Sequence, residues 1–210
     1  MRILETYSHL NGEEYLVVHH PEMYREIKDV IAHVNASRCM TKSSKESTMR
    51  GKKLYSPPAI NGEFHRLFRQ RGWGESRYEY YVTTNRDYLQ DIIQLSPKEQ
   101  RQYLIDKGVK DPMYSYKQTD FVKNRIAIEV QFGKYAFVAF DLFVKHLLFY
   151  TGGVINVGIE VLPMKCMSRD PAGGRRLSTG IAYFEGEVYN ILRHGRNSPP
   201  VPLLIIGIAP

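Results

Sequence analysis

The sequence predicts an α/β protein in which a mixed β-sheet is flanked by helices. Segments with the period-2 alternation of strands and segments with the 3.6-residue apolar period of helices follow one another along the chain. Two segments, 154–162 and 203–208, have the continuous apolar character of buried strands. The 210 residues are enough for one domain, residues 1–210, that buries its core without disulfides.

The first half of the chain predicts helices joined by a basic loop and one aromatic strand. Proline in a first helical turn and serine before a helix mark the expected starts. The expected elements are an extended segment 15–18, a helix 21–35 opened by Pro21, a helix 59–71 after the Pro57-Pro58 turn, a strand 77–83, and helices 86–95 and 97–107, the last with Ser96 and Glu99 at capping-box spacing.

The second half predicts a hairpin, a buried helix, and strands around another helix. Residues 137–150 are apolar on nearly every side, so we expect this helix in the core or in a subunit interface, with His146 as a packed or interface histidine. Strand 154–162, an irregular basic stretch 166–178, a helix 181–192 and strand 203–208 complete the chain.

A pair of acids in the predicted hairpin is the candidate site. Segments 118–122 and 125–131 form its strands, with a turn at Lys123-Asn124 that places Asp120 opposite Ala127 and diagonal to Glu129, roughly 7–8 Å away. Glu129 and Gln131 project from one face, and two carboxylates there suit Mg²⁺. The alternative is an ordinary exposed strand whose acids pair with Lys123 or Arg125.

Composition indicates an anionic partner and a reducing compartment. The formal net charge is +7, which favours nucleic acid as a partner. Cys39 and Cys166 are too few for a disulfide framework or a zinc cluster. The longest apolar run, residues 135–150, is interrupted by Asp141, Lys145 and His146, so it does not predict a membrane span. We expect a soluble cytoplasmic protein with no membrane partner.

Two basic segments are candidate contacts for DNA. Residues 38–53 carry six basic side chains against one acid and lack apolar periodicity, which predicts a mobile basic loop that neutralises phosphates. The alternative for this segment is a solvated linker. The second segment, 166–178, has Arg175 and Arg176 at its centre.

The segment TDFVKNRIAIEVQFGKYAFVAFDLFVKH resembles the active-site region of type II restriction endonucleases that cut around a central GATC, the group of BstYI and BglII. Similarity to the BstYI branch extends through YSHLNGEEYL, VGIEVLPMK, YFEGEVYN and LLIIGIAP. The resemblance implies a PD-(D/E)xK core, a homodimer on palindromic DNA, Mg²⁺-dependent phosphodiester hydrolysis, and a DNA methyltransferase protecting the same site in a prokaryotic cytoplasm.

The same resemblance assigns roles to the hairpin residues. Asp120 takes the position of the metal-bridging aspartate and Glu129 that of the second acid, while the carbonyl of Val130 completes the metal ligands. Gln131 stands where most of the superfamily has lysine, and Thr119 replaces the proline. Because glutamine cannot act as a general base, Gln131 is expected to orient the attacking water through its amide.

Base reading is expected from two places. Lys134, just beyond the catalytic strand, faces the major groove in the family, and Ser178-Thr179 matches its recognition loop, whose hydroxyls tolerate either purine. The implied site is R/GATCY, cut to leave 5′ phosphates and 5′ overhangs. Residues 170–177 resemble an insertion that brings extra arginines. The further expected DNA contacts are Arg175, Arg176, Lys42, Lys45 and Lys123.

Two other functions compete with a nuclease. A sequence-specific DNA-binding protein that keeps the fold without cleavage also explains the charge and Gln131. The pair Asp120 and Glu129 argues against it, because acids facing phosphates weaken binding unless a cation joins them. A structural or RNA-processing protein would show no dependence on divalent ions.

Overall fold

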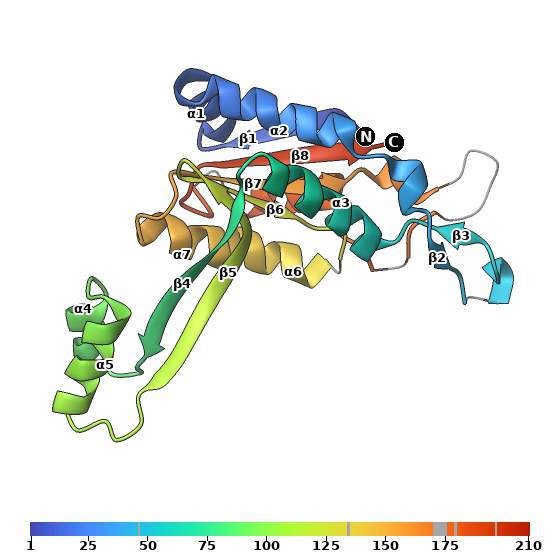
Figure 1. Ribbon diagram of the computed structural model, residues 1–210. Helices are drawn as coiled ribbons and strands as arrows, with labels where there is room; N and C mark the ends of the chain where they lie inside the picture. The colour runs from blue at the N-terminus through green and yellow to red at the C-terminus, as the bar shows by residue number, and fades with distance from the viewer. Residues whose placement is uncertain (46, 134, 170–175, 179, 196) are drawn as a thin grey trace.

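A six-stranded mixed sheet forms the centre of the computed structural model, which describes residues 1–45, 47–133, 135–169, 176–178, 180–195 and 197–210 (Figure 1). Strands β6, β7 and β8 are parallel to one another, whereas β1, β5 and β4 each run antiparallel to a neighbour. The mixed sheet confirms the predicted class. Its order is β1 (Arg2–His9), β8 (Leu203–Ala209), β7 (Val157–Pro163), β6 (Ile126–Val130), β5 (Met113–Lys123) and β4 (Gly74–Val82).

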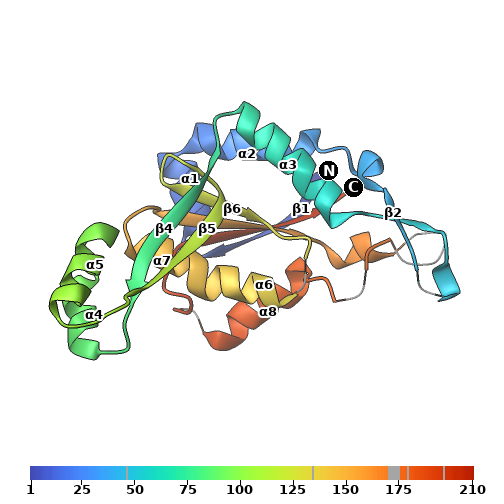
Figure 2. The same cartoon turned by 60° about the horizontal axis from the view of Figure 1, so that its bottom comes forward.

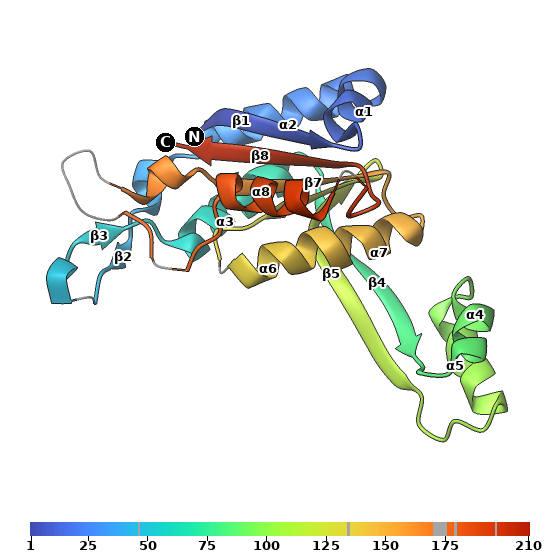
Figure 3. The same ribbon diagram turned by 180° about the vertical axis from the view of Figure 1, so that it is seen from behind.

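Helices cover both faces of the parallel strands. In Figures 1 and 2 one face carries α1 (Gly12–His19), α2 (Pro21–His33) and α3 (Pro57–Gln70). The opposite face carries α6 (Tyr135–Phe140), α7 (His146–Thr151) and α8 (Phe184–His194), as Figure 3 shows from behind. Every residue of β6, β7 and β8 is therefore buried, as expected for parallel strands with both faces covered.

Aromatic side chains fill the space between α3 and the hairpin. The Phe68 ring lies 4.7 Å from the Phe121 ring and 5.5 Å from the Trp73 ring, measured between centroids. Phe121 pairs with Ile128 across β5 and β6, so the hairpin turns this face toward α3. The opposite face of β6, with Glu129 and Gln131, consequently faces α6 and α7.

Helix starts follow the local capping signals. Ser56 accepts a hydrogen bond from the Ala59 amide and precedes Pro57 at the first position of α3. Ser96 and Glu99 form the predicted capping box of α5 (Pro97–Asp106). Together with α4 (Arg86–Ile92), α5 sits at the tip of the long β4–β5 ribbon, which projects from the rest of the molecule (Figure 1).

The predicted extended segment 15–18 is wrong, because these residues belong to α1 and the first strand is β1. A short apolar run does not separate helix from strand by pattern alone. Tertiary packing decides it here, since a Cβ at Gly12 would lie 2.3 Å from the Leu203 carbonyl oxygen. Glycine lets the start of α1 approach β8.

The basic segment 38–53 is not a loop throughout. It contains the antiparallel pair β2 (Lys42–Ser43) and β3 (Lys53–Leu54), with a 3₁₀ turn at Ser47–Met49 between them. Leu54 and Met49 are buried, which ties this small hairpin to the core.

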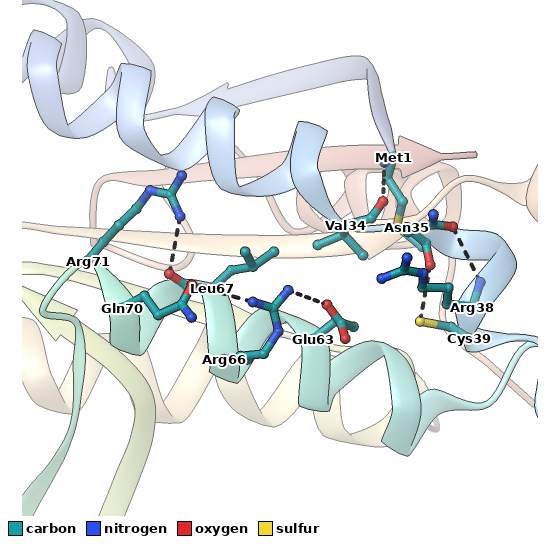
Figure 4. A network of polar contacts seen from close by, with 10 residues as sticks. All are labelled: Met1, Val34, Asn35, Arg38, Cys39, Glu63, Arg66, Leu67, Gln70 and Arg71. Atoms are coloured by element: carbon teal, nitrogen blue, oxygen red, sulfur yellow. Dashed lines mark hydrogen bonds and ion pairs between the residues drawn. The ribbon is translucent and has the colours of Figure 1, made fainter.

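Local polar contacts stabilise the segment that precedes this hairpin and, separately, helix α3 (Figure 4). The Asn35 side chain accepts from the Arg38 amide at 3.3 Å, which caps the 3₁₀ helix η1 (Ala36–Cys39). The amino group of Met1 donates to the Val34 carbonyl at 2.6 Å. On the adjacent helix, Arg66 pairs with Glu63 at 2.8 Å.

The hairpin register differs from the prediction. Asn124 and Arg125 both have positive φ, 48° and 63°, so they form the two-residue turn in place of Lys123-Asn124. The register pairs Phe121 with Ile128 and Val122 with Ala127. Continuing it by one pair brings Asp120 directly opposite Glu129. Glu129 stands inside the sheet and not at its edge, because β6 lies between β5 and β7.

No helix among the described residues is long and apolar enough to cross a membrane. The segment 137–150 instead runs through α6, a π-helix at Asp141–Lys145 and α7, and it packs on the sheet.

We expect the β8 core to dominate stability. Leu204→Ala, at a fully buried site, should lower the free energy of unfolding by about 2–5 kcal/mol through lost burial and a residual cavity. Leu192→Ala on α8, where the leucine is 58% exposed, is the matched control and should change it by less than about 0.5 kcal/mol. Urea denaturation measures both, and equal losses would contradict this packing.

Candidate active site

The candidate site forms where β5 and β6 meet beneath the helix 135–151. Glu129 projects from the middle of the sheet and is only 2% exposed, whereas Asp120 on β5 is half-buried. Glu129 is therefore no part of an exposed strand face, and the alternative of a solvated acid is wrong. Arg125, a suggested partner in that alternative, instead donates to Asn156 Oδ1 at 3.0 Å.

Burial and a neighbouring acid act together on Glu129. Burial raises the pKa of its carboxyl group well above the ordinary range, and the charge of Asp120 raises it further. The influence of Asp120 agrees with the register that places the two acids opposite each other. Like-charged carboxylates held this way favour a cation between them.

A lysine from the helix reaches the same acid. Lys145 Nζ lies 3.0 Å from Glu129 Oε1 and 2.6 Å from Asp141 Oδ1. Burial alone lowers the pKa of Lys145, but the two carboxylates more than offset it, so its pKa is raised and the ammonium stays charged. Asp141 and Lys145 are site residues that the sequence reasoning missed.

Gln131 joins this group through its amide. Its Nε2 donates to Asp141 Oδ2 at 3.1 Å, and its Oε1 accepts from the Gly133 amide at 3.1 Å. These two bonds fix the orientation of the amide. Asp141 thus links Gln131 to Lys145, and Lys145 links to Glu129, so one network holds Glu129 on β6 and Gln131 directly after it.

A π-turn places the two helical residues. The His146 amide donates to the Asp141 carbonyl, which is the i+5 bond of the π-helix η3 (Asp141–Lys145). A signal for this part of the site was present in the sequence, because Asp141, Lys145 and His146 are ionisable residues within an otherwise apolar helix.

His146 and Glu160 form a neighbouring buried pair. His146 Nε2 lies 3.4 Å from Glu160 Oε2, and Glu160 is the register partner of Glu129 in β7. Burial lowers the pKa of His146 to about 3 and raises that of Glu160 well above 4.5. Burial therefore favours the neutral form of both groups. The prediction of His146 as a packed histidine is confirmed.

The donor set suits a hard divalent ion with several waters. Within the residues that the structure describes, no group of three or more His, Cys, Asp or Glu side chains is arranged to hold a metal. Asp120 and Glu129 supply two carboxylates, and the Val130 carbonyl stays a predicted third ligand. Mg²⁺ commonly binds through one or two carboxylates and retains waters, so the residues present fit it.

Two of the predicted DNA contacts lie together. Lys42 Nζ donates to Ser178 Oγ at 2.6 Å, which joins the β2–β3 hairpin to the second basic segment. The Tyr55 amide adds a backbone bond to the Arg176 carbonyl at 2.8 Å, and Lys45 is exposed nearby in the chain. Lys134, Arg175 and Thr179 lie outside the described residues.

Lys123 has a structural position. Its ammonium lies 2.9 Å from Glu26 Oε1 and donates to the Arg71 carbonyl at 2.7 Å, which ties the hairpin to α2 and α3. The Lys123 ammonium, which was predicted to contact DNA, is thus already bound to these two partners. We therefore leave Lys123 out of the proposed DNA surface.

A mixed sheet with facing acids on β5 and β6 defines a restriction-endonuclease-like α/β protein. The family model for restriction endonuclease BglII/BglIII matches residues 4–208, so the chain belongs to this family of type II restriction endonucleases, which cleave DNA at specific sites.

Solved structures of BglII share the fold of this chain. The crystal structure of BglII complexed with a DNA 16-mer matches with a TM-score of 0.64 and 16% identity, covering 99% of this chain and 76% of that one. Free BglII matches with a TM-score of 0.56 and 18% identity, covering 100% and 80%. No curated protein sequence matches the chain.

The raised pKa of Glu160 makes the stability of the fold depend on pH. Its contribution to stability is full below its ordinary pKa of 4.5 and falls as pH rises toward the raised pKa of the folded state. Glu160→Gln removes this titration, so the variant should lose less unfolding free energy than the wild type between about pH 5, just above the ordinary pKa, and about pH 7. Urea denaturation at both pH values tests this, with the exposed Glu5→Gln as control. Equal pH slopes for wild type and Glu160→Gln would refute the neutral pair.

Proposed function

We propose that this protein hydrolyses double-stranded DNA with Mg²⁺ at a palindrome centred on GATC, with R/GATCY as the proposed site and 5′-phosphate overhangs as products. The observation that carries the proposal is the buried Glu129, on which the charge of Asp120 acts, in a fold of the BglII/BglIII family. The similarity of the sequence to the BstYI branch supports the particular site.

The residues of the hairpin have distinct roles in this proposal. Asp120, Glu129 and the Val130 carbonyl would hold the Mg²⁺ ion. That ion supplies a bound water of lowered pKa and offsets charge on the phosphoryl oxygens. Gln131 orients the attacking water, because its amide is already fixed by Asp141 and the Gly133 amide yet retains one N–H.

Duplex DNA is the proposed partner. The matched BglII structure contains a DNA 16-mer, and the net charge of +7 supports the same partner here. A palindrome is read by a twofold protein, so we propose a homodimer of single-domain subunits, residues 1–210. The proposed DNA contacts within the described residues are Lys42, Lys45, Arg176 and Ser178. Those outside the described residues are Lys134, Arg175 and Thr179. A cytoplasmic methyltransferase would protect the same site.

One observation favours a second candidate, a DNA-binding protein without cleavage. Lys145 already neutralises Glu129 at 3.0 Å, so the acid is compatible with a nearby phosphate without a metal ion. The two candidates differ in whether divalent ions are required for strand scission.

Plasmid digestion separates them. With Mg²⁺ the wild type should produce discrete fragments whose sequenced ends share GATC, and Asp120→Ala or EDTA should abolish them because the metal site is lost. The exposed Asp29→Ala on α2 is the matched control and should cleave normally. Specific binding with intact plasmid under all conditions would leave only the non-cleaving candidate.

The β2–β3 hairpin is expected to contact backbone phosphate. Lys42→Ala should weaken binding about equally for cognate and unrelated duplexes and reduce the salt slope of log K by about 1, because one phosphate contact is lost. Fluorescence anisotropy in Ca²⁺ at several salt concentrations measures this. Lys107→Ala, at the end of α5 on the projecting ribbon, is the control. An unchanged slope for Lys42→Ala would exclude that lysine from the DNA surface.

A further inference from the structure

Lys145 occupies an unusual place for a lysine. Its side chain is 14% exposed, and its ammonium lies between the carboxylates of Glu129 and Asp141, which are each 3% exposed. It enters from the helix, whereas Gln131, directly after β6, stands at the position that most of the superfamily gives to lysine. The site therefore contains a lysine ammonium, but the helix and not the strand supplies it.

Stability alone gives a weak reason for this arrangement. Desolvating buried ions costs about as much as their attraction returns, so a buried ion pair is often replaceable by apolar residues. Apart from His146 the helix around this pair is largely apolar, and its π-turn brings Asp141 and Lys145 over Glu129. A positive charge held beside the acids has a direct electrostatic effect on a divalent ion at the same acids.

We propose that Lys145 is a tethered counter-ion that takes the place of the divalent cation at Glu129 when no metal is bound. Metal entry moves the ammonium away from Glu129 while Asp141, at 2.6 Å, retains it. Lys145 is thus a positioning residue that sets metal affinity. The inference rests on the proposed function, because it assumes that Glu129 is a metal ligand.

The balance of charges explains why Lys145 is expected to weaken metal binding. Asp120, Glu129 and Asp141 act on one another electrostatically, and within this group of side chains Lys145 is the cation that offsets them. An ammonium beside a divalent ion repels it, and this repulsion persists at the intermediate dielectric constant of a partly buried site. Removing that charge should therefore strengthen metal binding.

Lys145→Gln tests the charge while keeping hydrogen-bond donors. Calorimetric titration with Ca²⁺, without DNA and near pH 9 where protons compete least, should give a dissociation constant on the order of tenfold lower than that of the wild type. Lys145→Arg keeps the charge and should restore wild-type affinity. Lys107→Gln, which makes the same change on the projecting ribbon, should leave the affinity unchanged.

Thermal unfolding gives a second readout. Without metal, Lys145→Gln should have a lower Tm than the wild type, and saturating Ca²⁺ should raise its Tm more than that of the wild type. If the variant is unfolded without metal, folding on addition of Ca²⁺ also supports the proposal. Failure to fold in saturating Ca²⁺ contradicts it.

The outcomes separate this inference from the proposed function. A folded Lys145→Gln protein with unchanged or weaker Ca²⁺ affinity overturns the counter-ion role, even if the wild type cleaves DNA. A wild type that binds no Ca²⁺ in calorimetry and cuts no DNA with Mg²⁺ overturns the metal assignment itself. Glu129→Gln, which removes the ligand, should lose Ca²⁺ binding in either lysine background.

Discussion

The turn at Asn124-Arg125 is the constraint on which the candidate site depends. Two consecutive left-handed residues close the β5–β6 hairpin with one register, and a slip of one residue would turn Glu129 to the other face. This register brings Asp120 toward Glu129 and leaves Phe121 and Ile128 on the face covered by α3. The hairpin thus positions the acids and a part of the core at once.

Placing Glu129 in the middle of the sheet has an electrostatic consequence. Burial and the charge of Asp120 both disfavour an isolated carboxylate there. The helix over this face supplies a compensating cation, Lys145, and Asp141 connects that lysine to Gln131. The acid, the amide and the lysine form a single network, so a change in the helix affects both Glu129 and Gln131.

Similarity to BglII is high in fold and low in sequence. At 16–18% identity the TM-scores are 0.64 and 0.56, so the fold is shared although most residues differ. The β2–β3 hairpin and the segment that contains Ser178 meet through Lys42, although 136 residues separate the two in the chain. Such surface elements vary more freely than a buried sheet.

The sequence by itself determined the α/β class, most helix limits and the candidate acids, because apolar period, capping residues and strand alternation are local properties. Ser96 with Glu99 and the Asp120, Glu129 and Gln131 spacing are examples. Only the tertiary structure decided that residues 15–18 are helical, that Lys123 binds Glu26, and that Lys145 reaches Glu129. Each of these depends on which distant segment packs nearby, and no local pattern encodes that choice.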